Sequence, residues 1–418
     1  MWFDERAPWY YPAISHCSQY LSETLRQVPD DGVVVTLGAT ALKTVLNLHG
    51  AAGVTMKDFH HTVNRDPTGR YWVIPTFHPS HLQRGAMNLL EVVTSAYAKA
   101  VEIGRRGFTR AACELVVDPP VEWFRSWIDR YLQELARDPD GAWLALDTEF
   151  PEGIEGQDES EIATGAASRI LRVNGACGAG LGWTVPYVGD YIREVERLLA
   201  GCAAGKAWMF LWNKYADLDL LQQAGHTLDG IIAIDAMWAW HYLQSDLPRG
   251  LGFVAALASD HPPWKHWAKQ PDRQGPYAAA DGVQTYRTAV WIVKALQAAG
   301  QWDIFMRDWH DRDELVLQPA QELGVPVDRV RLEAFHQDLQ VKQTAILERI
   351  KLTQAEGSLR PKGGYAKKPK GKACATCNGA GYLPPEDGWS ECPTCHGDKF
   401  QPPQPPKTIT GAVKLGKR

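Results

Sequence analysis

The chain has 418 residues, of which 45% are hydrophobic and 22% are charged, and a net charge of −5 at pH 7. This length gives room for two or three domains, and the composition lets most of the chain bury a globular core. No apolar run of about 18 residues or more occurs, which excludes a membrane span. The first residues lack the basic and then apolar layout of a secretory signal, so we expect a cytoplasmic protein with no membrane partner.

The charge is unevenly distributed along the chain. From Lys351 to Arg418 the sequence holds twelve Lys or Arg and five acidic residues, so this tail carries +7 and the remainder −12. A basic tail suits a polyanionic partner such as a nucleic acid. A solvated linker without a partner explains the same pattern equally well.

Strand-like and helix-like segments alternate over most of the chain. In the N-terminal part, the sequence predicts strands at residues 32–37 and 71–77 and helices at 39–47 and 87–104. A second series is predicted with strands at 142–150, 207–212 and 231–234, and helices at 121–136, 189–202, 216–224 and 277–299. This alternation predicts an α/β domain over roughly residues 115–302, which a helix at 329–350 follows.

Two carboxylates stand at the end of the predicted strand 142–150. Asp147 and Glu149 are two residues apart, so both side chains point to the same face of that strand. Neighbouring carboxylates repel each other unless a cation lies between them, and a hard divalent ion such as Mg²⁺ fits that place. The alternative is an acidic pair that only begins a solvated loop.

Two further pairs have helical spacing. Asn213 and Asp217 are four residues apart, as are Tyr277 and Asp281, so each pair shares one face of a helix. The first pair is also explained by helix capping, which Asn and Asp both favour. The second is also explained by a half-buried tyrosine beside a surface aspartate.

Taken together and in this order, the three pairs resemble the motifs of the DEDDy 3′→5′ exonuclease domain of family A DNA polymerases. The segment around Leu247, Pro248, Gly250 and Leu251 is similar to the stretch between the last two motifs of those enzymes. One position departs from the family pattern: Ala216 stands where an aromatic residue precedes the second aspartate. We expect either that Tyr215 takes that role or that the pocket is looser.

The resemblance implies an α/β fold of the ribonuclease H-like class, with a mixed sheet flanked by helices. It implies two Mg²⁺ or Mn²⁺ ions, with Asp147 bridging both, Glu149 and Asp281 completing one shell, and Asp217 holding the second ion through water. Tyr277 would orient or deprotonate the attacking water, and Asn213 and Tyr215 would contact the substrate.

The implied reaction is hydrolysis of phosphodiester bonds at the 3′ ends of single-stranded or frayed DNA. Two alternatives stay open. One is a ribonuclease D-like trimmer of RNA 3′ ends, because its motifs are the same. The other is a nucleic-acid-binding module without catalysis. Trp264 and Trp267, which lie between the last two motifs, are candidates for base stacking.

The N-terminal part resembles the later half of a uracil-DNA glycosylase. Residues 36–43 look like its central strand, turn and helix, and His78-Pro79-Ser80 looks like the loop that enters DNA beside a flipped base. The early motif that holds the water-activating residue is missing. Cys17 alone of the iron–sulfur cysteines is present, and one cysteine cannot hold a cluster. We therefore expect a partial domain without glycosylase activity.

The part after the predicted α/β domain resembles the start of the polymerase portion of family A enzymes. Gly324 to Asp328 matches the turn before the thumb helix, but no palm or fingers follow before Arg418. We expect no DNA synthesis by this chain alone. A separate polymerase subunit, or a longer protein than this reading, would supply the palm.

Four cysteines near the C-terminus form a metal-binding pattern. Cys374 and Cys377, then Cys392 and Cys395, make two CxxC pairs whose spacing fits one structural Zn²⁺ in a ribbon-like module. Disulfides are the alternative, and His396 is a competing ligand. The expected organisation is a partial glycosylase-like region at 1–112, an exonuclease domain at 113–302, the helical start of a thumb at 303–352, and a basic linker with the zinc module at 353–418.

Overall fold

The computed structural model describes residues 10–150, 170–324, 326–355, 382–383 and 390–391. Residues His16–Glu322 form one compact unit, and residues 1–15 and 323–418 are assigned to another. Within the described residues, none of the helices combines the length and the apolar character that a membrane crossing requires.

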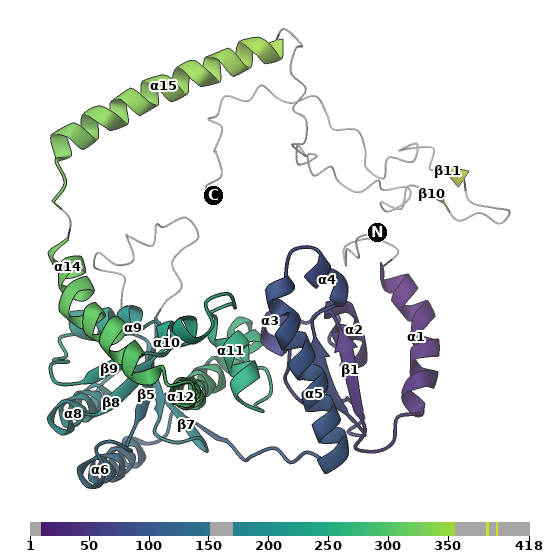
Figure 1. Ribbon diagram of the computed structural model, residues 1–418, viewed down its shortest axis with the longest axis horizontal. Helices are drawn as coiled ribbons and strands as arrows, with labels where there is room; N and C mark the ends of the chain where they lie inside the picture. The colour runs from purple at the N-terminus through teal and green to yellow at the C-terminus, as the bar shows by residue number, and fades with distance from the viewer. Residues whose placement is uncertain (1–9, 151–169, 325, 356–381, 384–389, 392–418) are drawn as a thin grey trace. The chain divides into compact units, whose positions relative to one another are not determined.

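A mixed six-stranded sheet is the centre of the larger unit (Figure 1). The strand order is β4-β7-β6-β5-β8-β9, and β6 runs antiparallel to both of its neighbours whereas the other pairs are parallel. This arrangement confirms the predicted fold class of a mixed α/β sheet with flanking helices. The strands are β4 (Glu114–Val117), β5 (Leu144–Glu149), β6 (Arg172–Ala176), β7 (Leu181–Pro186), β8 (Trp208–Leu211) and β9 (Ile232–Asp235).

Helices cover both faces of this sheet (Figure 1). Helices α6 (Val121–Arg137), α8 (Asp190–Gly205) and α9 (Lys214–Gln223) pack on the face that buries Leu144 and Leu146. Helices α10 (Ala236–Leu243), α11 (Leu251–Ala258) and α12 (Gln274–Ala298) cover the face that buries Ala145. Because side chains alternate along a strand, Asp147 and Glu149 lie on the α12 face, and Thr148 lies on the other.

Helix α12 approaches the sheet unusually closely because glycines remove the side chains between them. A Cβ added to Gly282 would lie 2.7 Å from the Gly175 nitrogen and 2.8 Å from its Cα. A Cβ added to Gly182 on β7 would collide with the Ala279 carbonyl. The small residues Ala278 to Ala280 are fully buried against the sheet. This close contact carries Asp281 toward the end of β5.

A small α/β region precedes the six-stranded sheet in the same unit; we call residues 16–106, which begin within helix α1, the N-terminal region. Its sheet has the order β1-β3-β2, with β1 parallel and β2 antiparallel to β3. Its elements are α1 (Tyr10–Arg26), β1 (Val33–Leu37), α2 (Ala39–Val45), α3 (Met56–Phe59), β2 (Asn64–Arg65), β3 (Trp72–Thr76), α4 (Pro79–Gln83) and α5 (Leu90–Arg106).

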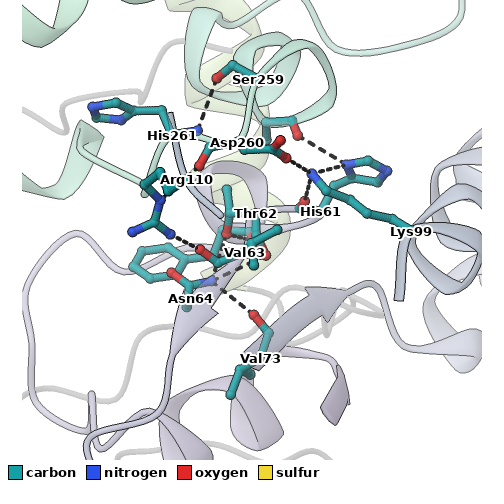
Figure 2. Close-up of polar contacts among 12 residues, drawn as sticks. His61, Thr62, Val63, Asn64, Val73, Lys99, Arg110, Ser259, Asp260 and His261 are labelled. Atoms are coloured by element: carbon teal, nitrogen blue, oxygen red, sulfur yellow. Dashed lines mark hydrogen bonds and ion pairs between the residues drawn. The ribbon is translucent and has the colours of Figure 1, made fainter. Parts of the chain in front are cut away.

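Polar contacts tie the N-terminal region to the last turn of α11 and to the segment that follows it (Figure 2). The Lys99 ammonium lies 2.7 Å from Asp260 and donates to the His61 carbonyl at 3.0 Å. His61 Nδ1 lies 3.2 Å from the Ala256 carbonyl oxygen. Arg110 donates to the carbonyls of Val63 and Asp260, so it bridges the two sides. Of these contacts, that of His61 with Ala256 joins residues 195 positions apart in the sequence, and that of Arg110 with Asp260 joins residues 150 positions apart.

Aromatic packing completes this junction. The buried His60 ring lies with its centroid 4.2 Å from that of Phe253 on α11 and 5.3 Å from that of Phe77. Burial, and then the neighbouring His61, lowers the pKa of His60 to about 3, so the ring packs as a neutral aromatic group at neutral pH. The N-terminal region and the six-stranded sheet therefore share one continuous core.

After α12 the chain continues through α13 (Trp302–Phe305), two π-helical turns at Met306–His310 and Asp313–Leu317, and α14 (Gln318–Leu323). In the other unit, α15 (Arg329–Ala355) forms the predicted long helix, and its side chains from Arg329 to Lys351 are exposed. Strands β10 (Tyr382–Leu383) and β11 (Ser390–Glu391) pair antiparallel. Four cysteines, Cys374, Cys377, Cys392 and Cys395, lie outside the described residues, so the zinc site stays a prediction.

The Gly282→Val substitution tests the close packing of α12. The added side chain has to displace the Gly175 backbone, so we expect the free energy of unfolding to fall by about 3 kcal/mol in urea titrations. Gly178→Val is the matched control, because a Cβ at Gly178 meets nothing within 4 Å. Equal stability of the two variants would show that the helix does not depend on this contact.

Candidate active site

Three carboxylates converge where β5 ends beside α12. Oxygen atoms of Asp147, Glu149 and Asp281 all lie within 4.8 Å of one another. Asp147 and Glu149 come from alternate positions of β5, and Asp281 comes from the helix that the glycine contact draws onto the sheet. Two of the three predicted motifs therefore meet in space, although more than 130 residues separate them.

Asn174 on β6 holds the first of these carboxylates. It is paired with Asp147 across the strands, and its side-chain amide donates to Asp147 Oδ2 at 2.6 Å and to the Ala278 carbonyl at 2.9 Å. The amide thus links β5, β6 and α12 at one point. The sequence alone does not single out Asn174, because the role of this residue depends on the register of strand β6, which no local pattern predicts.

Asp217 reaches the site from the opposite face of β5. It is buried, and its Oδ1 accepts hydrogen bonds from the Thr148 backbone N–H at 2.8 Å and from the Thr148 hydroxyl at 2.7 Å. Burial, and then the charge of Asp147, raises the pKa of Asp217 well above its ordinary value. The fourth predicted carboxylate is therefore adjacent to the cluster, but it is fixed by Thr148 and lies outside the group of three.

The two predicted substrate-binding residues of the second motif lie elsewhere. Asn213 is exposed, with a left-handed backbone at φ 71°, and the Tyr215 hydroxyl donates to Asp313 in a π-helical turn. Next to them the buried Lys214 ammonium lies 2.7 Å from Asp313 and 2.5 Å from Glu314. This ion-pair cluster anchors α9 and thereby helps to place Asp217.

Tyr277 and two residues from the preceding loop surround Asp281. The Lys265 ammonium lies 2.8 Å from Asp281 Oδ1, 2.9 Å from its Oδ2 and 3.3 Å from the Tyr277 hydroxyl. The Trp264 indole N–H donates to Asp281 Oδ1 at 2.5 Å. Trp264 is only 3% exposed, so its ring has no free face for a nucleobase, whereas Trp267 is half-buried. No motif in the sequence points to Lys265 as part of the site.

A cavity of about 510 Å³ opens over the carboxylates. The three clustered acids line it together with Lys265 and Tyr277. The lining also includes Thr148, Trp212, Met237 and the segment from Arg249 to Leu251. The Trp212 indole donates to the Arg249 carbonyl at 3.1 Å. The segment that resembled the polymerase family between the last two motifs therefore borders the cavity.

Burial and mutual repulsion govern the protonation of the acids when no ion is bound. Burial, and then the charge of Asp281, raises the pKa of Asp147 to about 7. Burial, and then the charges of Asp147 and Asp281, raises the pKa of Glu149 to about 9. A single ammonium group at Asp281 compensates only part of this negative charge, so the site is short of positive charge.

The residues present fit a hard divalent cation. Carboxylate oxygens are the ligands that Mg²⁺ and Mn²⁺ prefer, and three carboxylates supply them at close range. Among the residues that the structure describes, the buried Glu149 Oε1 atom has no hydrogen-bond partner, which is costly unless a ligand satisfies it. The arrangement suits phosphate chemistry, in which cations offset negative charge on the reacting group.

Two loops of the N-terminal region that resembled a glycosylase also meet in space. Gly38 after β1 has φ 87°, and a Cβ added there would lie 3.1 Å from the His78 Cβ after β3. The His78 ring accepts from the Ser80 backbone N–H at 3.1 Å and caps α4. His78 and Pro79 are exposed.

One protein-family model matches part of this chain, and several solved structures are similar to it. The model of the uracil DNA glycosylase superfamily matches residues 5–100, which is less than a quarter of the chain. No curated protein matches. The polymerase domain of Pol1 from M. smegmatis, solved with DNA primer-template and dNTP, is 12% identical with a TM-score of 0.41, and the match covers 63% of this chain and 42% of that one.

Two nucleases are also among the similar structures. Escherichia coli RNase D, an exoribonuclease, is 16% identical with a TM-score of 0.33, and the match covers 45% of this chain and 46% of that one. The EXO domain of Aedes aegypti Nibbler is 12% identical with a TM-score of 0.30, and the match covers 46% of this chain and 94% of that one. This chain spans less than half the length of the polymerase and RNase D chains it matches. At TM-scores below 0.5, these similarities carry no information about its activity.

The raised pKa of Glu149 predicts how pH changes stability in the absence of metal. Between its ordinary pKa of 4.5 and about 9, folded Glu149 keeps a proton that the unfolded chain has lost, so rising pH lowers the free energy of unfolding. Glu149→Gln removes this contribution. In EDTA, we expect the variant to gain stability relative to the natural chain from pH 6 to 9, by at most about 1.4 kcal/mol per pH unit. Parallel stability curves would contradict the raised pKa.

Proposed function

We propose that this chain is a metal-dependent 3′→5′ exonuclease that hydrolyses phosphodiester bonds at DNA 3′ ends. The observation that carries the proposal is the convergence of Asp147, Glu149 and Asp281 at an open cavity, where one Glu149 oxygen has no partner among the described residues. Four clustered or adjacent acids that served only the fold would destabilise it, because their burial disfavours their charged forms. A ligand-binding role explains why they are brought together.

In the proposed mechanism, the acids divide between two divalent ions. Asp147, Glu149 and Asp281 would hold one Mg²⁺ or Mn²⁺, with Asp147 shared, and Asp217 would hold the second through water while Thr148 fixes its other oxygen. The bound ions would neutralise charge on the scissile phosphate and lower the pKa of the attacking water. Asn174 keeps Asp147 in a single orientation toward this centre.

Tyr277 is placed to orient the attacking water. Burial, and then the charge of Asp281, raises the pKa of Tyr277 above its ordinary value, so the phenol stays protonated at neutral pH. A protonated phenol donates a hydrogen bond and cannot accept a proton as a base. Of the two roles that the resemblance implies for this residue, orientation of the water therefore fits its surroundings better than proton abstraction.

The cavity wall suits the last nucleotide of a strand. Trp212, Met237 and Leu251 offer apolar surface to a base or sugar, and Arg249 offers a positive charge to a neighbouring phosphate. We propose DNA over RNA because residues 5–100 match a superfamily that is named for DNA and share a core with the six-stranded domain. An RNase D-like action on RNA is the alternative that the assay below distinguishes.

We further propose that the exonuclease proofreads for a family A-type polymerase. The segment around Leu247 to Leu251 and the turn before α15 support this assignment through their resemblance to those enzymes. We also propose that the four cysteines Cys374, Cys377, Cys392 and Cys395 bind one structural Zn²⁺, with the basic tail next to them contacting the nucleic acid backbone. The spacing of the cysteines and the charge of the tail support these roles.

The Asp147→Asn variant tests the exonuclease directly. With 5′-labelled single-stranded DNA and Mg²⁺, the natural chain should produce a ladder of fragments shortened from the 3′ end. The variant should lose activity by a factor on the order of 10³, because the shared ligand is gone. Its stability in EDTA should not fall, because a repelling charge has been removed.

Asp219→Asn is the matched control, because Asp219 is exposed on the same helix as Asp217 and does not border the cavity. It should retain activity, whereas Asp217→Asn should lose it. Faster degradation of RNA than of DNA would favour the RNase D-like alternative. Undiminished degradation by Asp147→Asn would refute the proposed site.

A further inference from the structure

We propose that Lys265 is an internal counter-ion of the metal site, which holds Asp281 and Tyr277 in place in the ion-free protein and gives way when a divalent cation binds. We propose also that the N-terminal region sets the metal affinity of the site, because it seats the loop that carries this lysine. The inference rests on the proposed metal centre and adds a residue and a region to its control.

The lysine occupies the position that a cation would take at Asp281. Its ammonium contacts both Asp281 oxygens at 2.8 and 2.9 Å, and it lies 5.1 Å from the centre of the Tyr277 ring. Among the described residues, neither Asp147 nor Glu149 has a Lys or Arg nitrogen within 4.0 Å. Lys265 is therefore the one cation that the described chain itself places in direct contact with the cluster.

An ammonium group and a divalent ion compete for these Asp281 oxygens, because both are cations drawn to the same carboxylate. A second cation bound there would lie within a few ångströms of the ammonium, in a site where burial weakens solvent screening. The lysine side chain is long and flexible and borders the open cavity, so it has space to withdraw. Trp264 keeps its hydrogen bond to Asp281 Oδ1, so the carboxylate stays oriented after the lysine leaves.

The stem of Lys265 passes over a glycine. A Cβ added to Gly252 on α11 would lie 2.9 Å from Lys265 Cγ and 2.6 Å from Asp58 Oδ1 of the N-terminal region. A larger residue at position 252 would therefore block the lysine. Asp58 on α3 approaches the same glycine, so the N-terminal region borders the path of the side chain.

The next residue fixes the loop to the N-terminal region. The His266 ring lies with its centroid 5.4 Å from that of Phe59 on α3. A Cβ added to Gly53, where φ is 78°, would lie 3.1 Å from His266 Cα. The 3₁₀ turn Lys265–Lys269 is thus packed against residues 53–59, and the lysine enters the carboxylate site from that fixed base.

Binding of Mn²⁺ without nucleic acid, measured by isothermal titration calorimetry on the full chain, tests the inference. Lys265→Met removes the competing charge, so we expect its dissociation constant for Mn²⁺ to fall roughly tenfold. Its melting temperature in EDTA should fall, because the acids lose their cation. Lys265→Arg keeps the charge and should restore an affinity close to that of the natural chain. Unchanged or weaker binding by a folded Lys265→Met protein would overturn the counter-ion role.

Two further variants separate the parts of the inference. Lys269→Met, an exposed lysine of the same turn, is the matched control and should bind Mn²⁺ like the natural chain. His266→Ala removes the ring contact with Phe59 and leaves every residue of the metal site in place. The loop then holds Lys265 against Asp281 less firmly, so the dissociation constant of this variant for Mn²⁺ should fall, by a smaller factor than that of Lys265→Met. An affinity equal to that of the natural chain would overturn the role of the N-terminal region.

Mn²⁺ binding by the natural chain distinguishes failure of the lysine's role from failure of the proposed function. If the natural chain binds no Mn²⁺, the metal centre itself is wrong. If it binds Mn²⁺ with the same affinity as Lys265→Met, the metal centre stands and only the role of the lysine is refuted.

Discussion

The structure depends on the close contact between α12 and the central sheet. Gly282 on the helix lies against the Gly175 backbone on β6, and this contact brings Asp281 to the two carboxylates of β5. Burying acids side by side costs free energy, because desolvation and repulsion both disfavour their charged forms. A fold that maintains this arrangement needs compensating interactions, and the chain supplies them around the cluster.

Each compensating interaction comes from a different part of the fold. Asn174 donates to Asp147, Thr148 donates to Asp217, and Lys265 neutralises part of the charge at Asp281. None of these groups satisfies the buried Oε1 of Glu149. The cluster is therefore held in shape but left short of positive charge, which is the electrostatic condition under which a divalent cation binds with favourable energy.

Much of the site follows from local spacing in the sequence. Two residues along a strand or four along a helix share a face, so the pairs Asp147–Glu149 and Tyr277–Asp281 were predicted correctly to share a face. The resemblance to a known family then supplied the expectation that the pairs converge. Asp217 shows the limit of that expectation, because its contact with Thr148 places it beside the cluster and not within it.

The residues that sequence analysis missed depend on long-range geometry. Strands β4, β6 and β7 were not predicted, since Arg172–Ala176 mixes charged, polar and small residues, and Asn174 has meaning only through its pairing with Asp147. Lys265 reaches the site from a short 3₁₀ turn, whose sequence shows no hydrophobic periodicity. Likewise, the contact of Tyr215 with Asp313 depends on π-helical turns that no local pattern indicated.

The N-terminal region was expected as a separate partial domain, and its shared core with the six-stranded domain comes from contacts across about 150 to 200 residues.

Anomalous diffraction from crystals grown with Mn²⁺ tests the central claim most directly, because it locates the ions without relying on catalysis. The account predicts an Mn²⁺ peak bonded to oxygens of Asp147, Glu149 and Asp281, a second peak near Asp147 on the side of Asp217, and the Lys265 ammonium turned away from Asp281. Crystals with no Mn²⁺ at the three carboxylates, and with the lysine still bonded to Asp281 at saturating metal, would contradict it.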